Sequence, residues 1–297
     1  MDLEPKQAEA FLAVAETGNF ERAAERLNIT PSAVSQRLRV LEASLGTPLI
    51  LRTRPCRPTQ MGQRLLQYLR RAQLLNKDFQ ADIRGNEAGP TTVSMALNSD
   101  SLGTWFFPAL AGLLVKDQFI LDLVVEDQDH TFALLKTGMV IGCVSTVAEP
   151  MRGCSAESLG TMRYRLVASR AFCARWLPDG LTREAARRAP VVAYTRKDTL
   201  QSTILLEQLG LPEGAYPSHY VPGTEAHFHA VRYGIGYAMV PESLLAICDD
   251  RTDPLVDLAP HHPTDVALYW HTWQVQSPRM EELSRHIVRA ARGILGR

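Results

Sequence analysis

The sequence predicts a helical N-terminal domain, a long connecting helix and a larger α/β region behind it. Three short helical patterns fill the first 45 residues. Apolar residues spaced four and three apart over residues 65–83 are typical of one long helix with an apolar stripe. From residue 91 onward, strand-like apolar runs alternate with helical patterns, which indicates an α/β domain with parallel strands. A chain of 297 residues is long enough for two or three such units.

The composition is that of an ordinary globular protein, with 45% apolar and 22% charged residues. No apolar run approaches the roughly 20 residues that a membrane helix needs, and the polar, acidic N-terminus does not resemble a signal peptide. We therefore expect a cytoplasmic protein without a membrane partner. The cysteines are odd in number and form no CxxC pair, so they predict free thiols rather than disulfides or a zinc site. They are Cys56, Cys143, Cys154, Cys173 and Cys248.

A basic block stands out in an otherwise balanced chain. The formal net charge of the whole chain is zero, yet residues 37–71 contain eight arginines and one acid, Glu42, for a net charge of +7. Such a block is typical of a surface that binds a polyanion, although a solvated helix face gives the same count. The segment is therefore the first place to look for contacts with double-stranded DNA.

The first 45 residues predict three helices. The first two cover residues 6–16 and 20–27 and are separated by the breaker Thr17-Gly18-Asn19. The third is predicted to begin at Pro31, because Thr30 is a good N-cap and proline is tolerated at the first helical position. It is predicted to end near Leu45, because Gly46 is a natural helix stop.

The third helix has two different faces. Its aliphatic residues fall within about 60° of one another, and its hydroxyl, amide and guanidinium side chains lie on the opposite side. This is the design of a recognition helix, whose apolar face packs on its neighbours while its polar face enters the major groove. Gln36 suits adenine edges, Arg39 suits guanine, and serine or threonine hydroxyls suit phosphates. The predicted DNA contacts here are Thr30, Ser32, Ala33, Ser35, Gln36 and Arg39.

A short hairpin, or wing, is predicted after this helix. Residues 48–51 form an apolar strand, and arginine, threonine and proline alternate behind it. Arg52, Arg54 and Arg57 of this hairpin are placed to neutralise phosphates or to reach into a minor groove. These three arginines complete the predicted DNA contacts.

The segment AFLAVAETGNFERAAERLNITPSAVSQRLRVLEASLGTPLILRTRPCRPTQMG resembles the winged helix-turn-helix of the LysR family of transcription regulators. The only departure from the family's AA..L..T.sAvS..I..LE..lG..LF.R pattern that we note is Ile50, where the family usually has phenylalanine. The matching positions are Ala23, Ala24, Leu27, Thr30, Ala33, Val34, Ser35, Leu41, Glu42, Leu45, Gly46, Leu49 and Arg52.

The resemblance implies an all-α winged helix-turn-helix domain over residues 1–60, a linker helix and hinge over 61–90, and an effector-binding domain over 91–297. The effector-binding domain is expected to be α/β, with two lobes joined by two crossing strands, as in periplasmic binding proteins. Lobe one is expected over residues 91–162 and 267–297, and lobe two over residues 163–266.

The linker helix is predicted to begin after the N-cap Thr59 and to end near Ile83. Its apolar stripe needs a partner surface, and the resemblance implies that this partner is the same helix of a second subunit, in a homodimer or homotetramer. Packing of the stripe within the chain is the alternative. The predicted dimer contacts are Leu65, Leu69, Ala72 and Phe79.

The second half alternates between predicted strands and helices. In open α/β sheets, ligands bind beyond the carboxyl ends of the strands, often against helix N-termini. Polar segments follow predicted strands at residues 98–101, 126–130 and 145–146, and residues 223–225 open a helix with residues 194–198 nearby. The predicted strands cover residues 91–97, 119–127, 139–146, 164–169, 190–195, 218–222, 234–240 and 266–273; the predicted helices cover 101–114, 130–136, 198–209, 224–233, 241–246 and 278–293.

The residues in these segments predict a cationic amino acid as the effector. Ser99 and Ser101, beside free N–H groups, suit a carboxylate, and Thr146 and Thr224 supply hydroxyls. The alternative for Asp100 and Asp129 is that they only cap helices. The acids that suit ammonium or guanidinium groups are Asp100, Glu126, Asp127, Asp129 and Glu225.

A closer resemblance supports this prediction. NSDSLGTWFFPAL, VEDQDHT, GCVST and VALYW resemble the ArgP/LysG branch of the LysR family. That branch responds to lysine, arginine or sometimes histidine and controls the export of basic amino acids. The resemblance implies L-lysine or L-arginine as the effector, no cofactor, and a transcription activator for which contact with RNA polymerase is a further expectation.

The sequence carries no catalytic signature, so we do not expect an enzyme. The dinucleotide fingerprint, the nucleophile elbow, the Walker loop and HExxH are all missing, and His227-Phe228-His229 and His261-His262 lack the spacing of metal ligands. The alternative function is an architectural DNA-binding protein or an inhibitor of replication initiation with little effector dependence. A periplasmic-type solute carrier is a third class, disfavoured by the helix-turn-helix.

Overall fold

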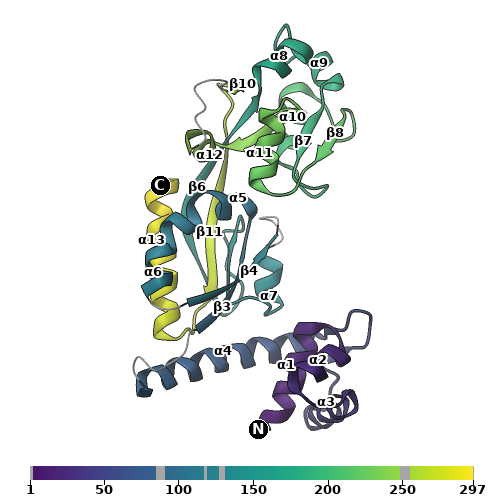
Figure 1. The fold of residues 1–297 in the computed structure, drawn as a ribbon, viewed down its shortest axis with the longest axis vertical. Coiled ribbons are helices and arrows are strands. Elements are labelled where there is room, and N and C mark those ends of the chain that lie inside the picture. Colours follow the sequence, from purple (N-terminus) through teal and green to yellow (C-terminus); the bar gives the residue numbers. More distant parts are fainter. Residues whose placement is uncertain (1–2, 85–90, 117–118, 127–130, 248–254, 297) are drawn as a thin grey trace.

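The computed structural model describes residues 3–84, 91–116, 119–126, 131–247 and 255–296. Figure 1 shows the three parts of the molecule in a row: the N-terminal helices at one end, helix α4 (Gln60–Arg84) beside them, and two lobes beyond α4. This arrangement confirms the predicted fold class. Among the described residues, no helix combines the length and apolar character needed to cross a bilayer.

The three predicted N-terminal helices are present as α1 (Pro5–Thr17), α2 (Phe20–Leu27) and α3 (Pro31–Leu45). Their ends follow from local chemistry. The Asn19 side chain accepts hydrogen bonds from the first backbone N–H groups of α2, and the Thr30 hydroxyl accepts from the N–H of Ala33 in α3. The glycines after α1 and α3 adopt the left-handed conformation that ends both helices.

The core of this domain holds the apolar face of α3 against α1 and α2. Val34, Leu38 and Leu41 are buried beside Phe11 and Val14 of α1. The wing consists of β1 (Ile50–Leu51), two residues shorter than predicted, and β2 (Arg57–Pro58), which are antiparallel. A carboxylate oxygen of Glu42 in α3 accepts hydrogen bonds from the N–H groups of Leu49 and Ile50, which joins the wing to the recognition helix.

Helix α4 begins where predicted, because the Thr59 hydroxyl accepts a hydrogen bond from the N–H of Gly62. Its apolar stripe was predicted to face a second subunit, but one part of it packs within the same chain and another part is exposed. Leu65 and Leu69 are buried in the core of the N-terminal domain of their own chain, which is the alternative of packing within the chain. The predicted contact of these two leucines with a second subunit is therefore corrected. The apolar residues that α4 leaves exposed are Met61, Tyr68, Leu75, Phe79 and Ile83, and Ala72 is half-buried.

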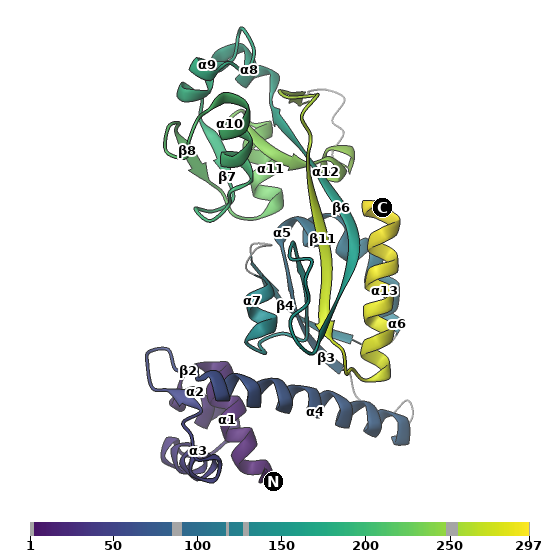
Figure 2. The same ribbon diagram turned by 180° about the vertical axis from the view of Figure 1, so that it is seen from behind.

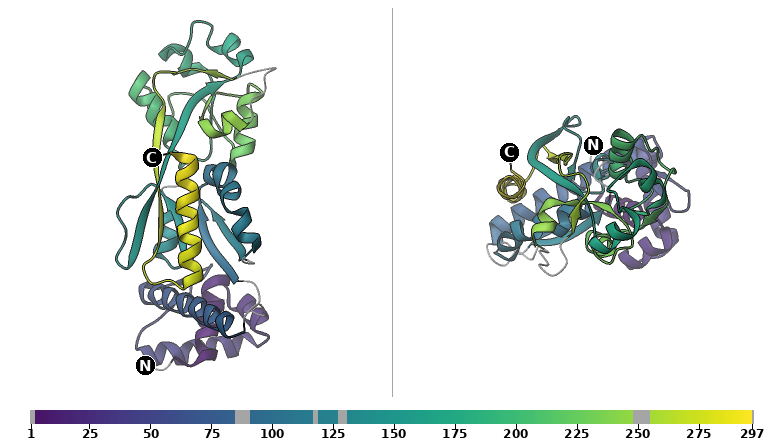
Figure 3. Two further views of the ribbon diagram at one scale, coloured as in Figure 1. Left: turned by 90° about the vertical axis from the view of Figure 1, so that its left-hand side faces the viewer. Right: turned by 90° about the horizontal axis from the view of Figure 1, so that it is seen from above.

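Lobe one contains a sheet in which β3 pairs in parallel with both β4 and β5. Figure 3 shows α13 and α6 side by side along this lobe, where Met280, Leu283 and Ile287 of α13 are buried in the core. The elements of lobe one are β3 (Thr91–Leu97), α5 (Ser99–Ser101), the π-helical turn η2 (Leu102–Phe106), α6 (Phe107–Lys116), β4 (Phe119–Val125), α7 (Thr131–Lys136), β5 (Gly142–Ser145) and α13 (Pro278–Leu295).

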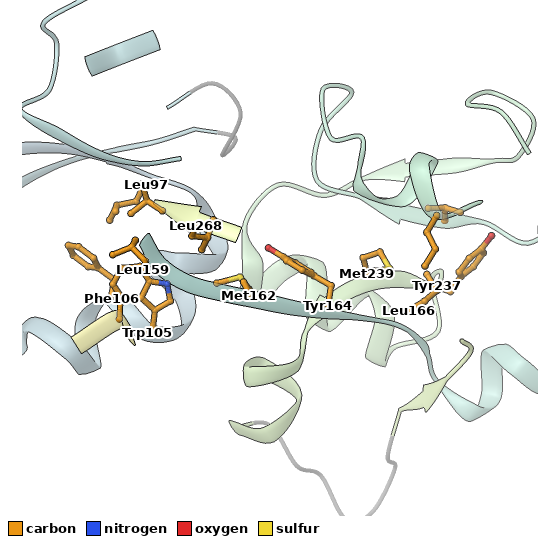
Figure 4. Close-up of a cluster of buried hydrophobic side chains, with 14 of the residues drawn as sticks. Leu97, Trp105, Phe106, Leu159, Met162, Tyr164, Leu166, Tyr237, Met239 and Leu268 are labelled. Atoms are coloured by element: carbon orange, nitrogen blue, oxygen red, sulfur yellow. The ribbon is translucent and has the colours of Figure 1, made fainter. Parts of the chain in front are cut away.

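Two long antiparallel strands connect the lobes. They are β6 (Cys154–Ala168) and β11 (Thr264–Trp273), which pair from Cys154 opposite Trp273 to Tyr164 opposite Thr264 and run together in Figure 2. Strand β6 starts ten residues before the predicted strand. In Figure 4 its side chains Leu159, Met162, Tyr164 and Leu166 follow one another from lobe one into lobe two, so one continuous core spans both.

Lobe two lies at the other end of β6 and β11. Two of its helices, α8 and α9, were not predicted from the sequence. The elements of lobe two are α8 (Arg170–Trp176), α9 (Arg183–Arg188), β7 (Val191–Ala193), α10 (Leu200–Leu209), β8 (Ser218–Tyr220), α11 (Thr224–Arg232), β9 (Ala238–Pro241), α12 (Glu242–Ile247) and β10 (Val256–Asp257).

Candidate functional site

A cavity of about 210 Å³ lies between the two lobes. Lobe one contributes the segment after β3 and the end of β4, and lobe two contributes the segment after β7 and the turn before α11. Strands β6 and β9 close one wall with Tyr164 and Met239. The cavity therefore lies beyond strand ends, the kind of position at which the sequence predicts a ligand site. Its lining residues are Asn98, Ser99, Asp100, Val125, Glu126, Tyr164, Tyr194, Thr195, Asp198, Leu200, Pro222, Gly223 and Met239.

The lining of the cavity is acidic. It includes the carboxylates of Asp100, Glu126 and Asp198, and among the described lining residues there is no lysine, arginine or histidine. A cation lies near one acid: the ammonium nitrogen of Lys197 is 3.6 Å from a carboxylate oxygen of Glu126. The arrangement favours a ligand that carries positive charge, because a wall lined by one sign of charge attracts the opposite sign.

Asp100 links three parts of the effector domain. Its carboxylate accepts hydrogen bonds from the hydroxyls of Tyr164 in β6, at 2.7 Å, and of Tyr194 in lobe two. The hydroxyl of Thr224, at the start of α11, lies 2.9 Å from the same carboxylate. The alternative that Asp100 only caps a helix is wrong. Asn98 holds the N-cap position, and the Asp100 carboxylate is hydrogen-bonded to these hydroxyls.

Ser99 and Thr224 make a second contact between the lobes. The Thr224 N–H donates to the Ser99 hydroxyl at 3.1 Å, and the two hydroxyl oxygens lie 3.0 Å apart. Gly103 lies close to Thr224, since a Cβ at Gly103 would come within 3.1 Å of the Thr224 Cβ. The start of the α5–α6 helical segment in lobe one and the start of α11 in lobe two thus face each other beside the cavity.

The two tyrosines act as neutral hydrogen-bond donors. Burial raises the pKa of Tyr164 well above its usual value, and the charge of Asp100 and the hydrogen bond to it raise it further. Burial, followed by the charge of Asp100, likewise raises the pKa of Tyr194. Both hydroxyls therefore keep their protons and donate them in hydrogen bonds to the carboxylate of Asp100.

His227 lies behind Tyr194. The two rings are stacked with centroids 4.5 Å apart, and His227 is buried. Burial lowers the pKa of His227 to about 4. The imidazole is therefore neutral at physiological pH and supports the tyrosine without adding a positive charge to the cavity wall.

The structure brings together only some of the predicted effector residues. Ser99, Asp100 and Glu126 line the cavity, and Thr224 is hydrogen-bonded to two of them. Three other predicted residues that the structure describes are not among those that line it. Ser101 is fully buried in the helical segment, Thr146 is half-buried after β5, and the side chain of Glu225 is exposed, 3.8 Å from His229. Asp127 and Asp129 lie outside the described residues.

Tyr164, Tyr194 and Asp198 are among the lining residues that the predicted site does not name. Tyr194 and Asp198 fall in the segment after β7 that the sequence placed near the ligand, so the signal for them was their position after a strand. Asp198 accepts hydrogen bonds from the N–H groups of Tyr194 and Leu200. Tyr164 lies within β6, and sequence position gives no signal that a mid-strand residue faces the cavity.

The N-terminal domain presents the predicted polar face of α3. Ser32, Gln36 and Arg39 are exposed, Ala33 and Ser35 are half-buried, and Val34, Leu38 and Leu41 of α3 face the core. Thr30 is exposed, with its hydroxyl engaged as the N-cap. The wing arginines Arg52, Arg54 and Arg57 are exposed, and Arg52 lies over the ring of Phe20.

Two arginines of the basic block do not belong to this surface. The side chain of Arg70 is only 14% exposed and pairs with Glu16, and Arg71 lies over the ring of Trp273 in the effector domain. The count of eight arginines therefore overstates the charge that is available to a polyanion.

Two family models cover most of the chain. Residues 5–63 match the bacterial regulatory helix-turn-helix protein, LysR family, and residues 87–292 match the LysR substrate-binding domain. The relatives include the transcriptional regulator ArgP of Aeromonas salmonicida, 38% identical over 96% of both chains. They also include the transcriptional regulator LysG of Mycobacterium bovis, 40% identical over 98% of this chain and 95% of that protein.

Solved structures give the same result. ArgP from Mycobacterium tuberculosis is 39% identical, with a TM-score of 0.84 and 98% of each chain covered. Full-length LysG from Corynebacterium glutamicum with the bound effector Arg is 32% identical, with a TM-score of 0.77 and coverage of 97% and 98%. CbnR in complex with its target DNA, 18% identical with a TM-score of 0.59, shares the fold. The two family models together cover most of the chain, and relatives at 38% and 40% identity cover nearly all of it. The chain therefore belongs to the LysR family of bacterial transcription regulators.

Proposed function

We propose that this regulator senses a basic amino acid, L-arginine or L-lysine, in the cavity between its lobes, and thereby controls genes for the export or metabolism of basic amino acids. The observation that carries the proposal is the charge of the cavity: three carboxylates line it, and no described lining side chain is basic. The relative LysG from Corynebacterium glutamicum was solved with the effector Arg, which supports the same class of ligand.

L-Arginine or L-lysine has three charged groups to place in this cavity. We assign its carboxylate to the Ser99 hydroxyl and the backbone N–H groups beside it, because no basic side chain lines the described wall. Asp100 is the acceptor for the α-ammonium group. Glu126 and Asp198, from opposite lobes, are the acceptors for the distal ammonium or guanidinium group. Each charge-assisted contact contributes about 1.5–3 kcal/mol.

Effector binding has to favour one arrangement of the lobes, or it has no influence on DNA binding. Asp100 and Ser99 in lobe one are hydrogen-bonded to Tyr194 and Thr224 in lobe two. An ammonium group that joins Asp100 changes the strength of these contacts between the lobes. The cavity therefore couples ligand binding to lobe geometry through the same side chains.

The DNA-binding role is assigned to residues 1–60, followed by the linker and hinge over 61–90 and the effector-binding domain over 91–297. Helix α3 enters the major groove, and the exposed wing arginines contact phosphates or the minor groove. The DNA contacts in this proposal are Thr30, Ser32, Ala33, Ser35, Gln36, Arg39, Arg52, Arg54 and Arg57.

We assign the subunit contact to the exposed stripe of α4. Tyr68, Leu75, Phe79 and Ile83 are exposed at helical spacing, and the same helix of a second subunit covers them in a homodimer. A homotetramer built from two such dimers is expected from the family, as is contact with RNA polymerase. Ala72, which is half-buried beside the stripe, stays in the predicted contact.

Footprinting on the promoter next to the protein's own gene tests the proposal. The full chain is titrated onto this promoter and onto an unrelated promoter of equal length, without ligand and with arginine, lysine, glutamate or phenylalanine. We expect a bounded protected site on the first promoter only, with protection that changes with arginine or lysine. Equal protection of both promoters, unaffected by every amino acid, supports the architectural DNA-binding alternative and contradicts the proposal.

A further inference from the structure

Arg70 connects all three parts of the chain. It lies in α4, and its guanidinium contacts two different parts of the chain: one nitrogen donates to the backbone carbonyl of Met139 in lobe one, and another lies 3.0 Å from a carboxylate oxygen of Glu16 in α1. The other oxygen of Glu16 pairs with Arg26 of α2. Arg70 therefore joins the helix-turn-helix, the linker helix and the effector domain through one side chain.

The backbone around Met139 is shaped for this contact. The Gln67 amide in α4 donates to the carbonyl of Lys136 at 2.7 Å. Gly138, which lies between Lys136 and Met139 in the sequence, has a φ of +72°. A Cβ at Gly138 would come within 2.6 Å of the Gln67 side chain. Only glycine therefore allows lobe one to approach α4 this closely. The Met139 side chain packs against the core of the N-terminal domain.

A second contact holds the same face of α4. Arg71 lies over the ring of Trp273, the last residue of β11, with 4.4 Å between the guanidinium carbon and the ring centroid. Consecutive arginines thus bind different strands and loops of lobe one. Since α4 shares the buried Leu65, Leu66 and Leu69 with the N-terminal domain, docking of α4 also fixes that domain.

The docked loop is close in sequence to the cavity. Strand β4 leads to Glu126 in the cavity wall, and α7 follows after residues 127–130. Helix α7 ends at Lys136, whose carbonyl meets Gln67. In Figures 1 and 2, α7 lies on the side of lobe one that faces α4 and the N-terminal helices. One short helix therefore separates a cavity acid from the clamp on α4.

We infer that Arg70 is a positioning residue that clamps the DNA-binding domain to lobe one of its own chain, and that this clamp makes operator binding respond to the effector. The response to the effector rests on the proposed function, whereas the contact of Arg70 with lobe one does not depend on it. Arginine is required because its planar fork serves a carboxylate and a carbonyl at the same time, which the single ammonium of lysine does poorly.

The first experiment measures coupling in the full-length protein. Operator affinity is determined with and without saturating arginine for the wild type, Arg70→Ala, Arg70→Lys and the control Arg64→Ala, which removes an exposed arginine from the same helix. Allosteric coupling typically changes affinity by about 5–150-fold. We expect arginine to change operator affinity by about tenfold in the wild type and in Arg64→Ala, and by less than about twofold in Arg70→Ala. Arg70→Lys is expected to be intermediate.

Calorimetry on the same variants separates coupling from binding. Arg70→Ala is expected to bind arginine as the wild type does, because Arg70 does not line the cavity. Full arginine response in a folded Arg70→Ala overturns the inference. If the wild type itself neither binds arginine nor responds to it, the proposed function fails, and the clamp is decided by the second experiment.

The second experiment needs no effector. Hydrogen exchange is followed by mass spectrometry in peptides that cover residues 61–72 and 136–141. In Arg70→Ala, and independently in Gly138→Ala, we expect these peptides to exchange about fivefold faster or more than in Arg64→Ala, since their shared contact is lost. Exchange equal to that of the wild type in both variants overturns the clamp, whatever the effector proves to be.

Discussion

The hydroxyl of Tyr194 in lobe two donates a hydrogen bond to the carboxylate of Asp100 in lobe one. Asp100 is buried, and the hydroxyls of Tyr164 and Thr224 meet the same carboxylate. A buried carboxylate held by neutral hydroxyls is stable only while those donors stay in place. The hydrogen bond between Tyr194 and Asp100 therefore links the position of lobe two to an acidic residue of the cavity wall.

Replacing Tyr194 with phenylalanine is expected to loosen this joint. The variant removes one donor from a buried carboxylate, so we expect the free energy of unfolding to fall by about 1–3 kcal/mol. Denaturant titration measures the loss, and Tyr233→Phe, at a site where the tyrosine is 79% exposed, is the matched control. A Tyr194→Phe variant as stable as that control would show that the hydrogen bond does not hold the lobes.

Gln36→Ala is expected to relax the sequence preference of DNA binding at one position of the operator. The side chain is exposed on α3 and suits an adenine edge, so its loss is expected to cost about 1–3 kcal/mol of discrimination. Arg54→Ala, in the exposed wing, is expected instead to weaken binding to all sequences and to reduce the salt dependence. Binding to single-base variants of the operator separates the two effects, and an unchanged preference in Gln36→Ala removes that residue from base recognition.

The two sides of α4 are expected to respond differently to mutation. Phe79→Glu combined with Ile83→Glu places charges on the exposed stripe, so we expect monomers with a stability near that of the wild-type chain. Leu66→Ala, on the buried side, is expected to cost about 2–5 kcal/mol of stability, because it leaves a cavity in the N-terminal core. Light scattering and thermal unfolding measure the two outcomes. An unchanged mass in the double variant would place the subunit contact elsewhere.

His227 predicts a specific dependence of stability on pH. Burial lowers its pKa from 6.5 to about 4 in the folded chain, so the unfolded chain binds the proton more readily. The contribution of the neutral ring is complete above about pH 6.5 and is lost as the pH falls toward 4, by about 3 kcal/mol in total. His227→Phe is expected to remove this part of the acid sensitivity while keeping a ring beside Tyr194. Stability is compared at pH 7 and pH 4.5 with His219→Phe, an exposed position, as the control; an identical loss in both variants contradicts the assignment.

The helices of the N-terminal domain and of the linker were largely predictable, because the sequence features that define them are local. Helix caps, a proline, two glycines and one clear apolar face define α1, α2 and α3 within a few residues of the structure. The stripe of α4 was predicted, but its division was not. A repeat of apolar residues predicts that one side of a helix is buried. It does not predict whether the same chain or a partner buries that side, and here the same chain buries Leu65 and Leu69.

The effector domain was less predictable because its key strands and contacts are long-range. The first half of β6 mixes buried and exposed residues without alternation, so it carries no strand pattern. Helix α9 has the sequence REAARR, which lacks an apolar stripe. Position after a strand located Ser99, Asp100 and Glu126, whereas Tyr164 reaches the cavity only through the crossing of β6 between the lobes.

Calorimetry of the full-length protein with arginine, lysine, histidine, glutamate and phenylalanine measures whether the cavity between the lobes selects basic amino acids. The variants are Asp198→Asn and Glu126→Gln in the cavity wall, and Asp179→Asn as an exposed acid in lobe two. We expect arginine or lysine to bind the wild type and Asp179→Asn equally and to bind a cavity variant about 10–100-fold more weakly. Glutamate and phenylalanine are expected not to bind. Preferential binding of glutamate or phenylalanine, or arginine affinity unchanged in both cavity variants, would show that the cavity is not a site for basic amino acids.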